Sequence, residues 1–339
     1  MRLELRPLLR CPECKRGNLK GLNLAGSEVP RGGLRCETCE ASFPVEGGVP
    51  IFLPRNVQLT SSDQGFSDLD RVTQQKILQR EWHDRAHIEE DDGYKRSAYT
   101  DQGLFAFLLY YQLREVEKLL AGRRYPRIAN IGCGHGFELD YLSRLGSNVT
   151  LVDISPKSLE RASARARKLG LQVDAVCTDA ENLPFRDNSF DLVLTHHSLH
   201  HLANPMAGLE EMLRVAKSRV AFFEPARGVM RSLVRAFGLK PEVEDSGNAV
   251  YEFGHSEVQD MCRGTGTELQ YFRKCLITGP TSQPKIFKKL DTYGVSAAVC
   301  SSIGLGNRLL GRLIGTKCSV LIEKNGGEIR GHSLRHGIL

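Results

Sequence analysis

An α/β fold with a doubly wound sheet is the fold class that this sequence predicts, and three features predict it. The first is residues 128–153, where an apolar run breaks into a glycine-rich turn, a helical pattern and a second apolar run that ends in Asp153. The second is the alternation of strand and helix patterns over residues 128–225. The third is the length of 339 residues, which allows one large domain and an appendage.

Each later element follows from a local pattern. Ser155 as N-cap and Pro156 at the first helical position predict a helix that Gly170 ends. Strands are expected at residues 172–177, 190–194, 219–223, 268–278 and 318–323, and helices at residues 206–216 and 256–263. Residues 279–316 are expected to be inserted between the last two strands.

Two further helices are expected ahead of the first strand, at residues 72–87 and 104–120, where they would cap the sheet and could form a lid. The predicted domain division is a zinc ribbon at 1–55, a linker at 56–70, a helical cap at 71–125, a cofactor-binding domain at 126–324 and a flexible tail at 325–339.

The composition of the chain limits the classes of function that it can have. The net charge of +6 permits an acidic partner such as RNA but does not demand one. No apolar stretch approaches the roughly 18 residues of a membrane span, and the charged start of the chain does not have the pattern of a secretory signal. The ten cysteines therefore do not indicate a disulfide framework, and we expect a cytoplasmic protein.

Four cysteines near the start of the chain have the spacing of a metal site. Cys11, Cys14, Cys36 and Cys39 form the pattern C-x2-C-x21-C-x2-C. Each C-x2-C turn lets two thiolates converge on one ion, and two such turns close a tetrahedral zinc site with no open position. The sequence therefore predicts a structural Zn2+ that supplies folding energy to a segment too short for a large core.

The residues around these cysteines carry a resemblance. The knuckles LRCPEC and LRCETC, followed by FPVEGGVPIFLP, resemble the zinc-ribbon family of methyltransferase activators, of the tRNA-methyltransferase partner type. The resemblance covers roughly residues 6–54 and implies that the four cysteines are the metal ligands. The ribbon could bind substrate, bind a partner or only stabilise the chain.

The glycine-rich turn admits two cofactors. A dinucleotide site favours G-x-G-x-x-G, whereas this turn is G-x-G-x-G and Phe137 stands at the position of the later glycine. The turn, VDIS, CTDAENLPFRDNSFDLV, THHSLHHL and EEMLRVAK together resemble class I S-adenosylmethionine-dependent methyltransferases of the type 11 kind, over about residues 126–225. The resemblance implies a seven-stranded Rossmann-like sheet with S-adenosylmethionine as cofactor.

By position, the resemblance also implies the cofactor contacts. The ribose hydroxyls would lie at Asp153, the adenine against Ile154, and the adenine edge at Asp179 and Ala180. Asn130 stands where the family more often has an acidic residue, so we expect a hydrogen bond to the ammonium of the cofactor without the charge. The methionyl end would lie along the turn residues Gly132, Cys133, Gly134 and Gly136.

Histidines follow the strand expected at residues 190–194, in THHSLHHL. Methyl transfer to a hydroxyl needs a group that accepts the hydroxyl proton, and histidine suits that role. His196 or His197 is the predicted base because the chain has just left the strand there; packing or helix capping is the alternative role. A metal on these histidines, with His200 and His201, is not expected because no carboxylate is spaced to join them.

These observations predict an enzyme that transfers a methyl group to a small-molecule acceptor, a hydroxyl of a sugar, a lipid-linked compound or a secondary metabolite. The alternative is an RNA methyltransferase in which the ribbon and basic segments hold phosphates. A non-enzymatic scaffold is a third possibility, and the intact cofactor motif argues against it. The basic segments contain Arg227, Arg231, Arg235, Lys285, Lys288 and Lys289.

Overall fold

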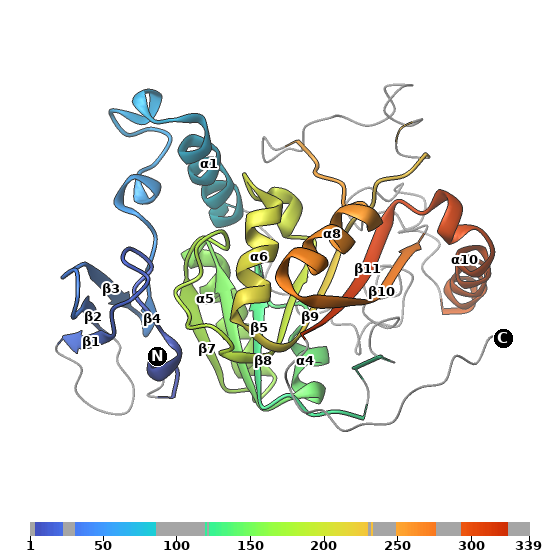
Figure 1. Ribbon diagram of the computed structural model, residues 1–339, viewed down its shortest axis with the longest axis horizontal. Coiled ribbons are helices and arrows are strands. Elements are labelled where there is room, and N and C mark those ends of the chain that lie inside the picture. Colours follow the sequence, from blue (N-terminus) through green and yellow to red (C-terminus); the bar gives the residue numbers. More distant parts are fainter. Residues whose placement is uncertain are drawn as a thin grey trace.

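The structure is a computed structural model that describes residues 4–22, 31–85, 119–120, 122–229, 232, 249–275 and 293–324. Within these ranges, a seven-stranded sheet forms the centre and a four-stranded sheet lies beside its β7 edge (Figure 1). No helix of the described part of the chain has the length and apolar character needed to cross a membrane.

The central sheet has the strand order β10-β11-β9-β8-β5-β6-β7. Strands β5 to β9 run parallel to one another, and β11 runs antiparallel to both of its neighbours. The strand order reverses between β5 and β8, and the carboxyl ends of strands at such a switch point are where α/β sheets bind ligands. The strands are β5 (Arg127–Ile131), β6 (Asn148–Asp153), β7 (Val173–Cys177), β8 (Phe190–His196), β9 (Ala216–Pro225), β10 (Thr267–Cys275) and β11 (Lys317–Lys324).

Helices pack on both faces of this sheet. Adjacent residues of β8 point to opposite faces, so Leu192 packs in one core with Leu142 and Leu159, and Val193 packs in the other core with Met212. The predicted doubly wound, Rossmann-like sheet is therefore confirmed. The first face carries α4 (Leu139–Leu145) and α5 (Pro156–Lys168), and the second carries α6 (Pro205–Val215) and α8 (His255–Thr265).

Some element boundaries differ from those predicted. Ala216 begins β9 instead of ending the preceding helix, because its backbone is already extended and α6 passes into the strand without a loop. The expected insertion contains a helix, α10 (Tyr293–Ile314), which packs on β10. The helix expected at 72–87 is α1 (Arg71–Arg85), whereas the one expected at 104–120 lies outside the described residues except for its last two.

The N-terminal segment forms a small antiparallel sheet that is joined to the edge of the large one. Phe52 N donates to Cys177 O at 2.8 Å, and Leu9 forms a bridge with Phe185. Leu34 and Phe52 also belong to the same buried cluster as the central strands. The two sheets therefore share a core. The small sheet consists of β1 (Leu19–Leu22), β2 (Arg31–Cys36), β3 (Ser42–Glu46) and β4 (Val49–Pro50).

The segment expected to be a linker is ordered against α1. It contains the 3-10 turns η2 (Arg55–Gln58) and η3 (Phe66–Asp68). The buried Arg80 guanidinium donates to the carbonyls of Val57 and Leu59, each at 2.6 Å. Helix α1 in turn packs against α5, so this segment holds α1 beside the carboxyl ends of β6 and β7.

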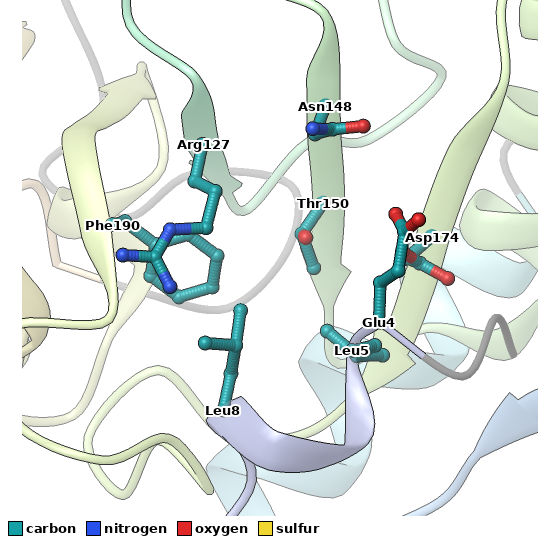
Figure 2. Close-up of a pocket in the computed structure, with 8 residues that line it drawn as sticks. All are labelled: Glu4, Leu5, Leu8, Arg127, Asn148, Thr150, Asp174 and Phe190. Atoms are coloured by element: carbon teal, nitrogen blue, oxygen red, sulfur yellow. The ribbon is translucent and has the colours of Figure 1, made fainter.

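A cavity of about 50 Å³ lies at the opposite, amino end of the strands (Figure 2). Arg127, Asn148 and Phe190, the first residues of β5, β6 and β8, line it together with Leu5 and Leu8. A cavity of this size holds about a few water molecules. It is a packing gap where the N-terminal segment meets the sheet, on the edge that faces away from the candidate site.

Candidate cofactor and acceptor site

The glycine turn after β5 uses its three glycines in different ways. All three have positive φ, at 61° for Gly132, 48° for Gly134 and 71° for Gly136. A Cβ on Gly132 would lie 1.7 Å from Ser198 Oγ, and one on Gly136 would lie 2.8 Å from Leu139 Cδ1. A Cβ on Gly134 would meet no atom within 4 Å. The turn is thus packed at both ends and open in the middle.

Asp153 lies at the end of β6, where its carboxylate receives the glycine turn. Its two oxygens accept hydrogen bonds from Gly134 N at 2.8 Å and Ser155 N at 2.9 Å. Burial raises the pKa of this carboxyl, against the lowering effect of His83 and of the two backbone donors. Because each carboxylate oxygen has two acceptor positions, Asp153 can still accept hydroxyl donors.

Asn130 is buried near the end of β5, and its amide nitrogen points to Glu138 Oε2 at 3.4 Å. Its Oδ1 has no hydrogen-bond partner among the described residues. A buried acceptor without a partner is costly unless a ligand satisfies it. Cys133, in the turn that follows, is buried, and its backbone N donates to Val152 O at 3.1 Å.

Asp179 and Ala180 follow β7 and are both buried. Lys76 of α1 donates to Asp179 Oδ2 at 2.5 Å and to Glu181 Oε2 at 2.9 Å. Burial would lower the pKa of the Lys76 ammonium, but the two carboxylates outweigh it and raise the pKa. Helix α1 therefore closes over this part of the edge, where Ile154 remains partly exposed.

His196, the last residue of β8, is paired with Glu138 at the start of α4. Its Nδ1 lies 2.9 Å from Glu138 Oε1, and both side chains are buried. Its Nε2 has no partner among the described residues, and neither has Oγ1 of the preceding Thr195. The carboxylate accepts from Nδ1–H, which leaves the lone pair of the imidazole on Nε2.

Two other histidines of the loop, His197 and His200, lie near Glu224, which is fully buried at the end of β9. Glu224 Oε2 lies 2.5 Å from His200 Nδ1. Burial raises the pKa of Glu224, but His200 and two backbone N–H donors outweigh it, so the pKa is lowered. The prediction that no carboxylate reaches these histidines is therefore wrong, because the parallel pairing of β8 with β9 brings Glu224 to the loop.

His197 has a different surrounding. It is a non-glycine residue with positive φ, 54°, and Lys317 Nζ lies 3.2 Å from its Nδ1. Burial, followed by the charge of Lys317, lowers its pKa well below the ordinary value. His201 lies beside His200 with ring centroids 4.1 Å apart, and burial lowers its pKa as well.

Four residues of this site were not predicted from the sequence: Glu138, Glu224, Lys76 and Lys317. Glu138 and Glu224 carried a usable signal, since each is a carboxylate at the carboxyl end of a predicted strand or in the turn that follows it. Lys76 and Lys317 carried none, because they reach the site from a helix and a strand that are distant in the chain.

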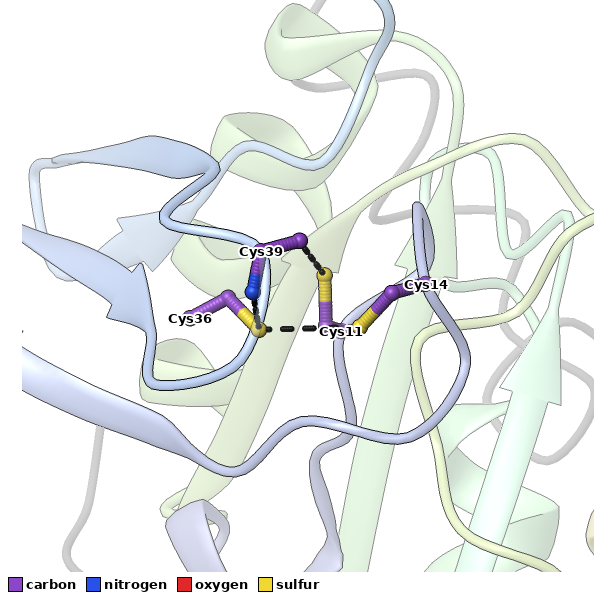
Figure 3. A group of neighbouring side chains, drawn as sticks. All are labelled: Cys11, Cys14, Cys36 and Cys39. Atoms are coloured by element: carbon purple, nitrogen blue, oxygen red, sulfur yellow. Dashed lines mark hydrogen bonds between the residues drawn. The ribbon is translucent and has the colours of Figure 1, made fainter.

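The four cysteine sulfurs converge in the small sheet (Figure 3). Cys11 Sγ lies 3.6 Å from Cys39 Sγ, and Cys14 Sγ lies 3.7 Å from Cys36 Sγ. Tetrahedral zinc with Zn–S bonds of about 2.3 Å separates its sulfurs by roughly 3.8 Å. The spacing of the sulfurs therefore fits the ion that the sequence predicts.

Backbone groups of the knuckles support this cluster. Gly17 N donates to Cys14 Sγ at 3.3 Å, and Thr38 N donates to Cys36 Sγ at 3.4 Å. Backbone hydrogen bonds, that of Arg16 first, lower the pKa of Cys14 to about 6. A Cβ on Gly17 would lie 2.0 Å from Cys36 Sγ, so the two knuckles close only around a glycine.

Comparison with known proteins agrees with this geometry. Residues 129–223 match the family described as a methyltransferase domain. This part of the chain is therefore similar to a methyltransferase domain. The match runs from β5 to β9 and so includes the glycine turn, Asp153, Asp179 and the histidine loop.

Curated relatives align with the same region. The ubiquinone biosynthesis O-methyltransferase of Parvibaculum lavamentivorans is 36% identical over 85 residues, which cover 25% of this chain and 34% of that protein. The protein named "Probable phthiotriol/phenolphthiotriol dimycocerosates methyltransferase 2" of Mycobacterium ulcerans is 34% identical over 120 residues, which cover 35% of this chain and 45% of that protein. The chain thus spans less than half the length of the curated relatives it matches.

Among solved structures, the magnesium protoporphyrin IX methyltransferase of Synechocystis, with bound SAH, is similar to this chain. It is 13% identical with a TM-score of 0.49, and the alignment covers 74% of this chain and all of that one.

Proposed function

We propose that this protein is an S-adenosylmethionine-dependent O-methyltransferase that acts on a hydroxyl group of a small molecule. The observation that carries the proposal is the buried Glu138–His196 pair, which presents an unpartnered Nε2 beside the glycine turn. The names of the curated relatives, among them a ubiquinone biosynthesis O-methyltransferase, support an oxygen acceptor and favour the lipid-linked class.

The residues at the carboxyl ends of β5, β6 and β7 fit the cofactor. The middle of the glycine turn is open at Gly134, and Asn130 Oδ1 is a buried acceptor that an ammonium group would satisfy. Asp153 would accept from the ribose hydroxyls, with Ile154 against the adenine and Asp179 and Ala180 at its edge. When bound, S-adenosylmethionine supplies a methyl group on a positively charged sulfur, which leaves as a neutral thioether.

The residues of the chain supply a group that accepts the proton and a buried site from which water is excluded. With the cofactor bound, the acceptor oxygen would take the methyl group from the sulfur, and His196 Nε2 would accept the proton that this hydroxyl loses. Glu138 Oε1 holds Nδ1–H, so it fixes the tautomer and stabilises the imidazolium that forms. Asn130 binds the other oxygen of Glu138, which links the cofactor end of the site to the base.

The ribbon is proposed to hold a structural zinc through Cys11, Cys14, Cys36 and Cys39. Its core is continuous with that of the methyltransferase domain, so the ion would stabilise the β7 edge of the cofactor site. We keep the predicted division into a ribbon at residues 1–55 and a catalytic domain at 126–324.

An RNA acceptor is not favoured. Arg227, one of the basic residues that suggested it, has its guanidinium 3.5 Å from the Glu257 carboxylate, so its charge already has an acidic partner. The curated relatives named above do not carry RNA in their names.

The test is methyl transfer from labelled S-adenosylmethionine by the full chain. The panel contains alkylated phenols and catechols, simple sugars and bulk tRNA. We expect label in at least one hydroxyl compound and none in tRNA. Transfer to tRNA with a steep fall at high salt would contradict the small-molecule assignment.

A further inference from the structure

We propose that His197, His200 and Glu224 form a second metal site, for a divalent transition-metal ion, at the carboxyl ends of β8 and β9. One ligand atom from each of the three residues lies within 4.8 Å of the other two. Two imidazole nitrogens and one carboxylate oxygen suit Zn2+, Co2+, Mn2+ or Fe2+, whereas Mg2+ and Ca2+ prefer oxygen ligands. Three protein ligands leave a coordination position open, as in sites that act on a substrate.

The Glu224 carboxylate is oriented by hydrogen bonds, as the carboxylate ligands of metal ions are. Its side chain is fully buried, and Oε1 accepts from Ser198 N at 2.9 Å and from Leu199 N at 2.7 Å. These two donors fix the carboxylate and direct Oε2 to His200 Nδ1, at 2.5 Å. An ion bound here would replace the proton that His200 and Glu224 share, with Nδ1 and Oε2 moving apart so that each reaches a metal–ligand distance of about 2.0–2.2 Å.

The backbone of the loop brings His197 to the same point. Its φ of 54° is in the left-handed region, which a non-glycine residue rarely adopts, and such strain is found mainly where a site requires it. The His197 backbone N donates to Phe223 O at 2.9 Å, which anchors the loop to β9 next to Glu224.

Lys317 sets the condition for binding. Its Nζ lies 3.2 Å from His197 Nδ1, and an ammonium group only donates hydrogen bonds. A neutral imidazole has a single lone pair, so His197 cannot accept from Lys317 and bind a metal at once. The ion and the Lys317 ammonium therefore compete for His197, and the charge of Lys317 also opposes the ion.

One consequence rests on the proposed function. The rings of His196 and His197 lie 4.5 Å apart, so an ion at His197 would be next to the proposed base. Its open position would be available to the acceptor oxygen, and a bound cation lowers the pKa of a hydroxyl it coordinates. The ion would then make the proton easier for His196 to remove.

The experiment counts metal ions on the full chain in the absence of cofactor and acceptor. Zinc-loaded protein is titrated with Co2+, and visible absorption with elemental analysis separates thiolate-bound from nitrogen- and oxygen-bound ions. We expect one ion beyond that of the four cysteines. The affinity for it should fall about tenfold or more in His197→Asn and His200→Ala, and rise roughly tenfold in Lys317→Met.

His197→Asn keeps a residue type that tolerates positive φ, and circular dichroism checks that each variant is folded. The control is His255→Ala, an exposed histidine on α8 that should leave the count and affinity unchanged. No second ion in wild type or in Lys317→Met, or a second ion that both histidine variants retain, would overturn the proposal. This experiment does not measure methyl transfer. A failure to detect methyl transfer would therefore count against the proposed function and not against the metal site.

Discussion

The two halves of the carboxyl edge of the sheet differ in how far apart their partners lie in the chain. At the ends of β5 and β6, Gly134 and Asp153 are 19 residues apart. At the ends of β8 and β9, Glu138 reaches His196 across 58 residues, and Lys317 reaches His197 across 120. The contact between the glycine turn and Asp153, in the proposed cofactor half, forms within one local motif, whereas the contacts of the proposed acceptor half join strands that are distant in the chain.

The largest expected effect comes from removing the metal of the ribbon. This change tests how far cofactor binding depends on residues outside the local motif of the glycine turn and Asp153. In Cys36→Ala, we expect the free energy of unfolding to fall by several kcal/mol, since structural zinc contributes roughly 10–16 kcal/mol in isolated zinc fingers. Cofactor binding should weaken too, because Phe52 pairs with the end of β7. Denaturant unfolding and calorimetry measure the two effects.

The matched control is Cys262→Ala, a buried cysteine of α8 outside the cluster. It should cost about 1 kcal/mol, as an ordinary small core change does. Equal losses for the two variants would show that the cysteine cluster does not stabilise the ribbon through a metal.

The acceptor half is tested by His196→Gln. Loss of a general base lowers kcat by about 10²- to 10⁴-fold, and the dissociation constant of S-adenosylhomocysteine should stay the same. Glu138→Gln should lower kcat less, because it keeps the shape but weakens the hold on Nδ1. Steady-state rates on the acceptor found by the panel provide the measurement. An unchanged kcat in His196→Gln would exclude the base role.

The contact between the two halves is tested at Gly132. A Cβ there would clash with Ser198, so Gly132→Ala should weaken cofactor binding by about 10-fold or more, and adding Ser198→Gly should restore part of the loss. Gly170→Ala is the control, since its φ is 69° but a Cβ would meet nothing within 4 Å. If Gly170→Ala weakens binding as much, backbone strain and not the clash is responsible.

The smallest expected effect is a pH dependence of the free energy of unfolding, caused by His135 in the glycine turn. Burial, with Arg161 nearby, lowers the pKa of His135 to about 4, whereas an unfolded histidine has a pKa of about 6.5. Between these values the unfolded state binds the extra proton, so the free energy of unfolding falls with falling pH, by at most about 1.4 kcal/mol per unit for this residue. Urea unfolding at pH 7 and pH 5 should show a shallower dependence in His135→Gln; the same slope in both proteins would refute it.

The same difference between local and distant contacts explains which parts of the site could be predicted from the sequence. The four cysteines converge as their spacing predicts, and Gly134 meets Asp153 because a βαβ unit has a fixed geometry. Nothing local predicts that Glu224 joins the histidines, because that contact depends on which strand lies beside β8. The fold class was predictable because each strand and helix repeats a short apolar period.

The central claim is that the carboxyl ends of β5, β6 and β7 bind S-adenosylmethionine. It is tested most directly by titration calorimetry of S-adenosylhomocysteine with wild type, Asp153→Asn and the control Asp174→Asn, a residue of the cavity at the amino end of the sheet. We predict that wild type and the control bind S-adenosylhomocysteine with similar affinity. In Asp153→Asn, we predict an affinity that is lower by about tenfold or more. No binding by wild type, or equal binding by all three proteins, would contradict it.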